Sequence, residues 1–160
     1  MTAVRVYLDV DDVLNAQMPP WHNVHTKKAV ISDKESYRVR WGGDLIDRLK
    51  TLPVEWVWAT SWRGHAPRVL APLLGWEEAE NFRWLDPDDP AYEYDYSIRW
   101  KSRAVLADQA ENPSPFIWVD NELEDIMLFN DMIPQRFANA GLSDYLIVAP
   151  KPWLGITPKQ

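Results

Sequence analysis

The chain has no cysteine, although it is 160 residues long. That absence excludes disulfide bonds, thiolate metal sites and a cysteine nucleophile. Long apolar runs are missing too, since no segment approaches the ~20 residues that a bilayer-spanning helix needs. Residues 1–8 lack the basic start and long apolar centre of a signal peptide. We therefore expect a cytoplasmic protein with no membrane partner.

An excess of positive charge is also absent, because the formal net charge is -7. This balance argues against a general electrostatic grip on nucleic acid or anionic membrane, although it leaves room for a local basic groove. The chain is instead 46% hydrophobic and contains 10 Trp residues. This composition predicts a single domain over residues 1–160 with a core rich in aromatic side chains.

Strand and helix patterns alternate along the chain. Runs rich in aromatic and β-branched residues predict strands over residues 4–8, 54–62, 81–85, 115–121 and 144–150. Apolar residues at helical spacing predict helices over residues 45–52, 67–74, 101–111 and 122–133. The alternation is typical of an α/β domain with a mainly parallel sheet and helices on both faces, a three-layer Rossmann-like arrangement.

Two polar segments interrupt this alternation. Within residues 16–43, the runs AVIS and YRVRW flank DKES, which predicts a short hairpin flap. Residues 86–97 are acidic, Tyr-rich and punctuated by Pro, which predicts a loop. Neither segment is long and regular enough to form a large additional domain.

Polar side chains stand where three of the predicted strands end. They are Asp9 and Asp11 after the first strand, Thr60 and Ser61 in the second, and Asp120 and Asn121 in a third. Ligands of open parallel sheets bind beyond the carboxyl ends of the strands, so we expect these groups to lie together, with Lys101 ahead of the third strand. Carboxylates gathered in this way fit Mg²⁺, which takes one or two protein carboxylates plus substrate phosphate and water.

The stretch LDVDDVLN, residues 8–15, resembles the first motif of the haloacid dehalogenase (HAD) superfamily. That motif is a strand followed by Asp-x-Asp, two further residues and a small apolar pair. Three more motifs follow in the HAD chain order: a strand-terminal Thr or Ser, a Lys, and a strand-terminal Asp with further acids. With VWATSW, FIWVDNE and LIVAPKPWLGITP, the chain also looks like the small HAD domains of the Swiss Army Knife RNA-repair type.

The resemblance implies a role for each motif residue. Asp9 would attack phosphorus and form an aspartyl-phosphate. Asp11 would protonate the leaving alcohol and later deprotonate the attacking water, while its backbone carbonyl helps to hold Mg²⁺. Thr60 would bind a phosphoryl oxygen, and Lys101 would neutralise charge on the nucleophile and on the phosphoryl group. Asp120 would bind Mg²⁺ directly.

Two positions depart from the HAD pattern. Asp12 sits where many members have Gly, and its role stays open. The fourth motif reads DNELED in place of paired Asp residues. Asn121, Glu124 or Asp125 is therefore the candidate that supports the metal beside Asp120.

Several nearby residues have a competing interpretation. The resemblance favours Thr60 over Ser61 as the second-motif residue, because the family pattern ends an apolar strand directly in Thr. Arg63 would either reach a substrate phosphate or face solvent. His22 and His25 suggest a metal pair, but without a third ligand nearby we interpret them as solvated loop residues.

The resemblance implies a Mg²⁺-dependent phosphomonoester phosphatase. In this superfamily inserted cap domains usually select small molecules, and the chain has room only for a flap. An open site suits a bulky phosphorylated substrate, such as an RNA or DNA end. The oligomeric state stays open.

Two other functions compete with a phosphatase. A PIN-type metal-dependent nuclease also clusters acids at strand ends of an α/β fold, but it has no need of Thr60 or Lys101. A binding domain that keeps the fold without turnover would account for the departures in the fourth motif and for any exposed Trp. A receiver domain fits less well, because its Lys follows the Thr on the last strand.

Overall fold

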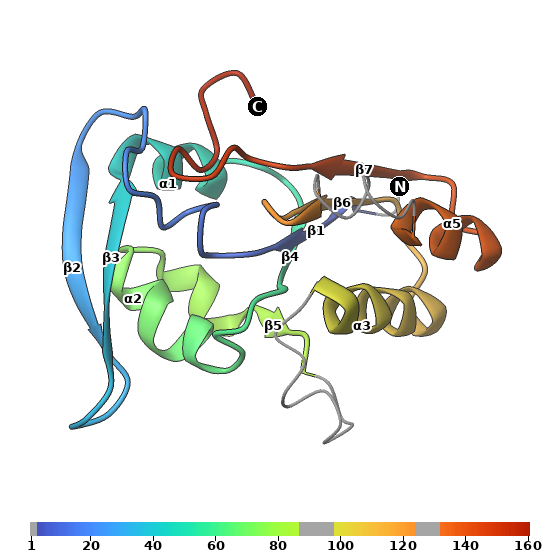
Figure 1. Cartoon of the computed structure of the whole chain (residues 1–160), viewed down its shortest axis with the longest axis horizontal. Coiled ribbons are helices and arrows are strands. Elements are labelled where there is room, and N and C mark those ends of the chain that lie inside the picture. The colour runs from blue at the N-terminus through green and yellow to red at the C-terminus, as the bar shows by residue number, and fades with distance from the viewer. Residues whose placement is uncertain (1–2, 87–97, 124–131) are drawn as a thin grey trace.

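The computed structural model describes residues 3–86, 98–123 and 132–160, and its centre is a five-stranded parallel sheet (Figure 1). The strand order is β5-β4-β1-β6-β7. The strands are β1 (Arg5–Leu8), β4 (Glu55–Trp58), β5 (Arg83–Trp84), β6 (Phe116–Val119) and β7 (Tyr145–Val148). The predicted α/β fold with a mainly parallel sheet is confirmed.

The first strand of the chain is the central strand of the sheet. All of β1 is buried, and it pairs in parallel with β4 on one side and β6 on the other. Strand alternation divides its side chains between the two faces, with Val6 and Leu8 in one core and Tyr7 in the other. A strand covered on both faces is rich in apolar residues, which accounts for Val6 and Leu8 before Asp9, while the buried Arg5 is paired with acids at the amino end.

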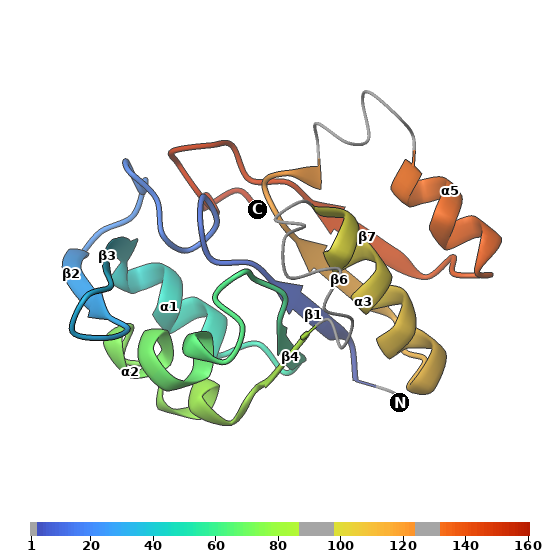
Figure 2. The same ribbon diagram turned by 60° about the horizontal axis from the view of Figure 1, so that its bottom comes forward.

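Helices cover both faces of the sheet (Figure 2). One layer holds α1 (Gly43–Lys50), a π-helical turn (Ala66–Leu70) that continues into α2 (Ala71–Leu73), and a 3₁₀ turn (Glu77–Asn81). The other holds α3 (Ile98–Glu111) and α5 (Met132–Asn139). These three layers are compatible with a Rossmann-like fold. No helix in the described ranges is long and apolar enough to cross a membrane.

Tryptophan fills much of the core between the sheet and the first helical layer. Trp58 and Trp76 are fully buried, and Trp56 meets Trp76 edge to face at 5.2 Å between ring centroids. Phe82 contacts all three indoles. The Trp58 indole N–H donates to the carbonyl of Ala79 at 3.2 Å, so its polar edge is satisfied although it is buried.

A two-stranded antiparallel hairpin stands beside the main sheet (Figure 1). Its strands are β2 (Val24–Val30) and β3 (Ser36–Gly42), so the predicted flap is confirmed, with a longer first strand. The turn closes where the Ile31 N–H donates to the Glu35 carbonyl at 2.9 Å. Gly42 ends the hairpin beside Trp21, and a Cβ there would lie 2.3 Å from the Trp21 Cβ, so only glycine fits without a shift.

A cluster of polar side chains lies at the amino end of the sheet. We call Arg5, Tyr7, Glu55, Arg83 and Asp108 the amino-end cluster. The Asp108 carboxylate accepts hydrogen bonds from the Tyr7 hydroxyl at 2.6 Å, from Arg5 at 3.0 Å and from Arg83 at 2.8 Å. Glu55 pairs with both guanidinium groups, at 2.9 Å and 3.0 Å. Strand β1 is thereby tied to β4, β5 and α3.

Several predicted boundaries differ from the structure. Strand β4 ends at Trp58, not at residue 62, because the chain turns where the Arg63 N–H donates to the Thr60 carbonyl. Strand β5 has two residues in place of the expected five. Helix α5 begins at Met132, so it shares only its first two residues with the helix expected over 122–133, and it runs on through Pro134. A proline in the first turn of a helix removes no intrahelical hydrogen bond. Most of the helix expected over 122–133 lies outside the described residues.

Candidate active site

The ends of three neighbouring strands bring the predicted site together. The Ala59 N–H donates to the Leu8 carbonyl at 2.8 Å, and the Asp9 N–H donates to the Val119 carbonyl at 3.0 Å. The parallel register therefore extends one residue past β1, which places Asp9 level with Asp120. Strand β1 lies between β4 and β6, so its carboxyl end is the natural meeting point.

Lys101 joins the two carboxylates. Its ammonium lies 3.0 Å from an Asp9 carboxylate oxygen and 2.7 Å from one of Asp120. All three residues are buried, with exposed fractions of 5%, 4% and 0% for Asp9, Lys101 and Asp120. Lys101 lies near the start of α3, so this helix supplies the cation to the strand ends. We call these three residues the carboxyl-end cluster.

The charges in the carboxyl-end cluster do not balance. Burial and the nearby Asp120 charge raise the pKa of Asp9 to about 7, although Lys101 opposes the shift. Burial also raises the pKa of Asp120 above its usual value, against the same opposing ammonium. Burial alone would lower the pKa of Lys101, but the two carboxylates outweigh it and raise that pKa. One ammonium thus serves two carboxylates, which leaves negative charge that a further cation would neutralise.

Asp11 is held apart from this cluster, at the surface. One of its carboxylate oxygens accepts from the Trp62 indole N–H and the other from the Asn15 side-chain amide, both at 2.9 Å. Neither of these two partners was predicted from the sequence. Asn15 lies within the first motif, four residues after Asp11, so its spacing offered a signal. Trp62 is 51 residues away, and nothing in the sequence indicates that contact.

Thr60 and Ser61 lie in a turn after β4, so strand alternation does not decide between them. Thr60 is fully buried, and its hydroxyl oxygen accepts from the Trp62 backbone N–H at 3.3 Å. Ser61 is exposed. Arg63 has φ 46° and lies 3.8 Å from the carboxylate of Asp86, so its side chain is directed toward that acid.

Asp12 has a structural role in the turn after β1. Its φ is 56°, in the left-handed region that Asp tolerates better than most residues. One carboxylate oxygen accepts from the Trp153 N–H at 3.0 Å, and its own N–H donates to the Asn15 carbonyl at 2.8 Å. Asp12 therefore ties the motif loop to the C-terminal segment, where the sequence reasoning had left its role open.

The remaining expected site residues lie in different parts of the chain. Asn121 is half-buried directly after Asp120, and the Glu122 N–H donates to the second Asp120 oxygen at 3.0 Å. Glu124 and Asp125 lie outside the described residues. His25 is in β2, not in a loop, and stacks on Trp41 with 5.3 Å between ring centroids.

The donor set of the carboxyl-end cluster suits a hard cation. Asp9 and Asp120 provide buried carboxylate oxygens with surplus negative charge, and Mg²⁺ prefers such oxygen ligands. Within the described ranges no three acidic or histidine side chains converge as a ready-made metal group. The backbone carbonyl of Asp11 is the ligand that the HAD resemblance implies.

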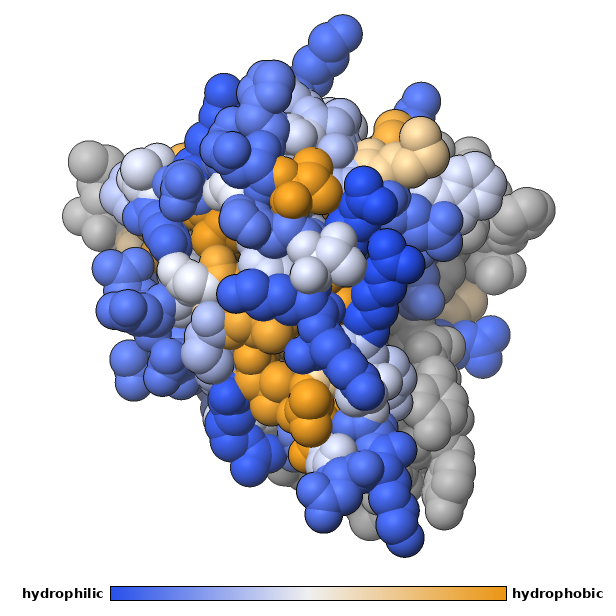
Figure 3. Space-filling view, turned by 90° about the vertical axis from the view of Figure 1, so that its left-hand side faces the viewer, coloured by the Kyte–Doolittle hydropathy of each residue, from blue (hydrophilic) through white to orange (hydrophobic). Residues whose placement is uncertain are grey.

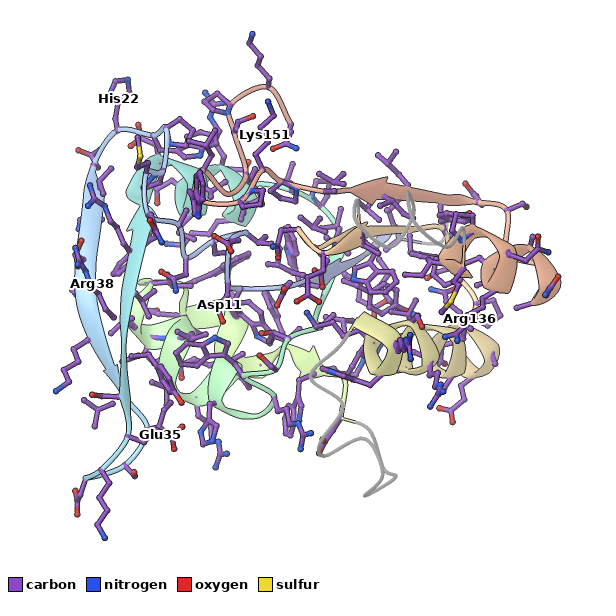
Figure 4. The ribbon with its side chains drawn as sticks, in the orientation of Figure 1. Asp11, His22, Glu35, Arg38, Arg136 and Lys151 are labelled. Atoms are coloured by element: carbon purple, nitrogen blue, oxygen red, sulfur yellow. The ribbon has the colours of Figure 1, made fainter. Side chains whose placement is uncertain are left out.

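A groove lies beside Asp11, lined by residues of the motif loop and of the hairpin. Figure 4 labels Asp11 of the motif loop and Arg38 of the hairpin. The groove has a volume of about 530 Å³, and Arg38 and Arg40 of β3 line its hairpin side. An adjoining hollow of about 430 Å³ shares Asp11, Asn15 and Arg38 with the groove and reaches Ser61. A substrate in the groove would lie against Asp11, two residues from the buried Asp9.

Comparison with known proteins yields no relative. No protein-family model matches the chain, and neither the curated proteins nor the solved structures contain a significant match.

Proposed function

We propose that the protein is a Mg²⁺-dependent phosphomonoester phosphatase with Asp9 as its nucleophile. The observation that carries the proposal is the buried ammonium of Lys101 between Asp9 and Asp120 at the carboxyl edge of a parallel sheet. This cluster has two buried acids for one base, and such an imbalance is typical of functional sites. An exposed acid, Asp11, follows Asp9 by two residues and lies at the edge of an open groove.

The reaction proceeds in two displacements at phosphorus. An Asp9 carboxylate oxygen attacks the phosphoryl group, and the bond to the ester oxygen breaks while Asp11 donates a proton to the leaving alcohol. Asp11 then removes a proton from water, whose oxygen attacks the aspartyl-phosphate and releases inorganic phosphate and Asp9. The exposed position of Asp11 suits proton exchange with both the alcohol and water.

Lys101 and Thr60 assist without exchanging protons. The Lys101 ammonium orients the attacking carboxylate and offsets the charge that develops on the phosphoryl oxygens. Thr60 borders the same strand ends, and its hydroxyl is the candidate donor to a phosphoryl oxygen. Asp9, Asp120 and the Asp11 carbonyl would hold Mg²⁺, which supplies Lewis-acid stabilisation of the phosphoryl charge.

A generic aryl phosphate tests this proposal. We expect hydrolysis by the wild-type protein with Mg²⁺ and little without it, and we expect Asp9→Asn to lose at least about 10⁴-fold in kcat. Asp33→Asn, in the exposed hairpin turn, is the matched control. Equal turnover by wild type and Asp9→Asn would disprove the assigned nucleophile. Internal cleavage of RNA that survives Lys101→Ala would support the PIN-type nuclease instead.

A further inference from the structure

The hairpin beside the site carries a charge opposite to that of the whole chain. Residues 24–42 contain five basic and two acidic side chains, while the chain has a net charge of -7. Figure 3 views this face and shows hydrophilic side chains over most of it, around a strip of apolar surface. The hairpin is therefore a basic element of an acidic protein, next to the candidate active site.

The hairpin register determines which of these cations face the groove. Ala29, Val39 and Trp41 are buried in the core, so their side of the hairpin is the inner side. Arg38 lies opposite Lys28, and Arg40 lies opposite Thr26, on the other side of the strand pair. Arg38 and Arg40 both line the groove beside Asp11.

In the part of the chain that the structure describes, these two guanidinium groups lack anionic partners. Within residues 3–86, 98–123 and 132–160, neither Arg38 nor Arg40 forms an ion pair. The Arg40 Nε atom is buried and, in the same ranges, has no hydrogen-bond partner. A buried donor without a partner is costly, so an acceptor from a ligand would relieve it.

The acids that line the groove are already engaged elsewhere. Both carboxylate oxygens of Asp11 accept hydrogen bonds from neighbouring side chains, and one oxygen of Asp12 accepts from the Trp153 backbone. The guanidinium groups therefore face the groove as available donors. The guanidinium group of Arg presents a planar fork of N–H groups, which is well suited to bind phosphate.

We propose that Arg38 and Arg40 bind a second phosphate of the substrate, so that the enzyme prefers the terminal phosphate of a single-stranded nucleic-acid end over a small phosphate ester. This inference rests on the proposed phosphatase. The terminal phosphate lies at Asp9, and the neighbouring diester lies against the hairpin. A sugar or amino-acid phosphate has no second phosphate to reach Arg38.

Two measurements on Arg38→Gln test this proposal, with Lys27→Gln as the matched control. Lys27 is on the same hairpin and loses the same charge, but it points into a hollow away from Asp11. The first measurement compares kcat/KM for a terminally phosphorylated oligonucleotide with kcat/KM for an aryl phosphate. The ratio of these two values should fall about tenfold in Arg38→Gln. In Lys27→Gln the ratio should change by less than about twofold.

The second measurement needs no catalysis. In Asp9→Asn, the anisotropy of a fluorescent oligonucleotide without a terminal phosphate reports binding to the hairpin. Adding Arg38→Gln should weaken that binding by about five- to tenfold and reduce its salt dependence, whereas adding Lys27→Gln should not. Binding that depends on Arg38, together with no hydrolysis of any phosphate ester by the wild-type protein, would support the groove as a binding site and refute the phosphatase. Hydrolysis with equal effects of Arg38→Gln and Lys27→Gln would overturn the second-phosphate site.

Discussion

The two ends of strand β1 carry polar clusters that differ in one respect, the balance of charge. The amino-end cluster has two Arg residues for Asp108 and Glu55, and each carboxylate has at least two donors. The carboxyl-end cluster has one Lys for two buried carboxylates. A balanced cluster stabilises the fold, whereas an unbalanced one costs stability and is typical of functional sites.

The pKa shifts of the carboxylates in the two clusters have opposite signs. Burial alone would raise the pKa of Asp108, but hydrogen bonds from Arg83 and Tyr7 outweigh burial and lower it. Arg5 and Arg83 likewise lower the pKa of Glu55 against burial. In Asp9 the effect of burial wins and the pKa rises to about 7. Ionisation is therefore favoured by the fold at one end of β1 and opposed at the other.

Removal of the shared cation should have the largest effect. Lys101→Met leaves two carboxylates buried without a partner, so we expect a loss of about 3–5 kcal/mol in the free energy of unfolding. We also expect kcat with an aryl phosphate to fall about 10²-fold or more. Urea denaturation at pH 8 measures the first quantity. Lys34→Met, in the exposed turn, controls for the lost charge, and an equal loss there would contradict the argument.

Disruption of the balanced cluster should affect stability alone. Asp108→Asn removes one of the two carboxylate charges that pair with Arg5 and Arg83. We therefore expect it to lower the free energy of unfolding by about 3 kcal/mol. The activity of the folded protein should stay within about twofold of wild type, because the cluster lies at the opposite end of β1 from Asp9. Asp144→Asn, an exposed substitution before β7, is the control. A large loss of kcat in Asp108→Asn would contradict the inference that the amino-end cluster affects stability alone.

Neutralisation of the nucleophile Asp9 should raise the free energy of unfolding, whereas the two substitutions above should lower it. Without Mg²⁺ at pH 8, Asp9→Asn removes a buried charge that the fold opposes, so we expect a gain of ~1–2 kcal/mol in the free energy of unfolding. Thermal melting in the presence of EDTA measures this gain. A clear loss of stability would mean that Asp9 is as well compensated as Asp108 and that the two ends do not differ.

The smallest expected effect is the pH dependence of the stability gain in Asp9→Asn. The folded-state pKa of Asp9 lies above its unfolded value, so its contribution to stability is present at acid pH and is lost as the pH rises toward about 7. Asp108 and Glu55 behave in the opposite way, since their lowered pKa values contribute stability that is lost as the pH falls below about 4. The metal-free stability gain of Asp9→Asn should therefore be larger at pH 8 than at pH 5. An equal gain at both values would refute the assignment of the shift to Asp9.

Most of the candidate site could be predicted from the sequence because strand ends are locally encoded. A buried strand followed by acids identifies Asp9 and Asp120, and the parallel topology then places both beside Lys101. The limits of β4 were predicted less well, because the aromatic run continues through a turn that Thr60 begins. No local pattern distinguishes Trp62 in that turn from Trp62 in a strand.

The amino-acid sequence by itself determined the α/β alternation, the parallel sheet and the acids at its carboxyl edge, because apolar periodicity and chain breaks act over a few residues. Only the tertiary structure decided that Asp11 is held by Trp62, that Asp12 serves a turn, and that Arg38 faces the groove. Such contacts join residues far apart in the chain. They depend on how the hairpin and the helices close over the sheet, which no short stretch of residues specifies.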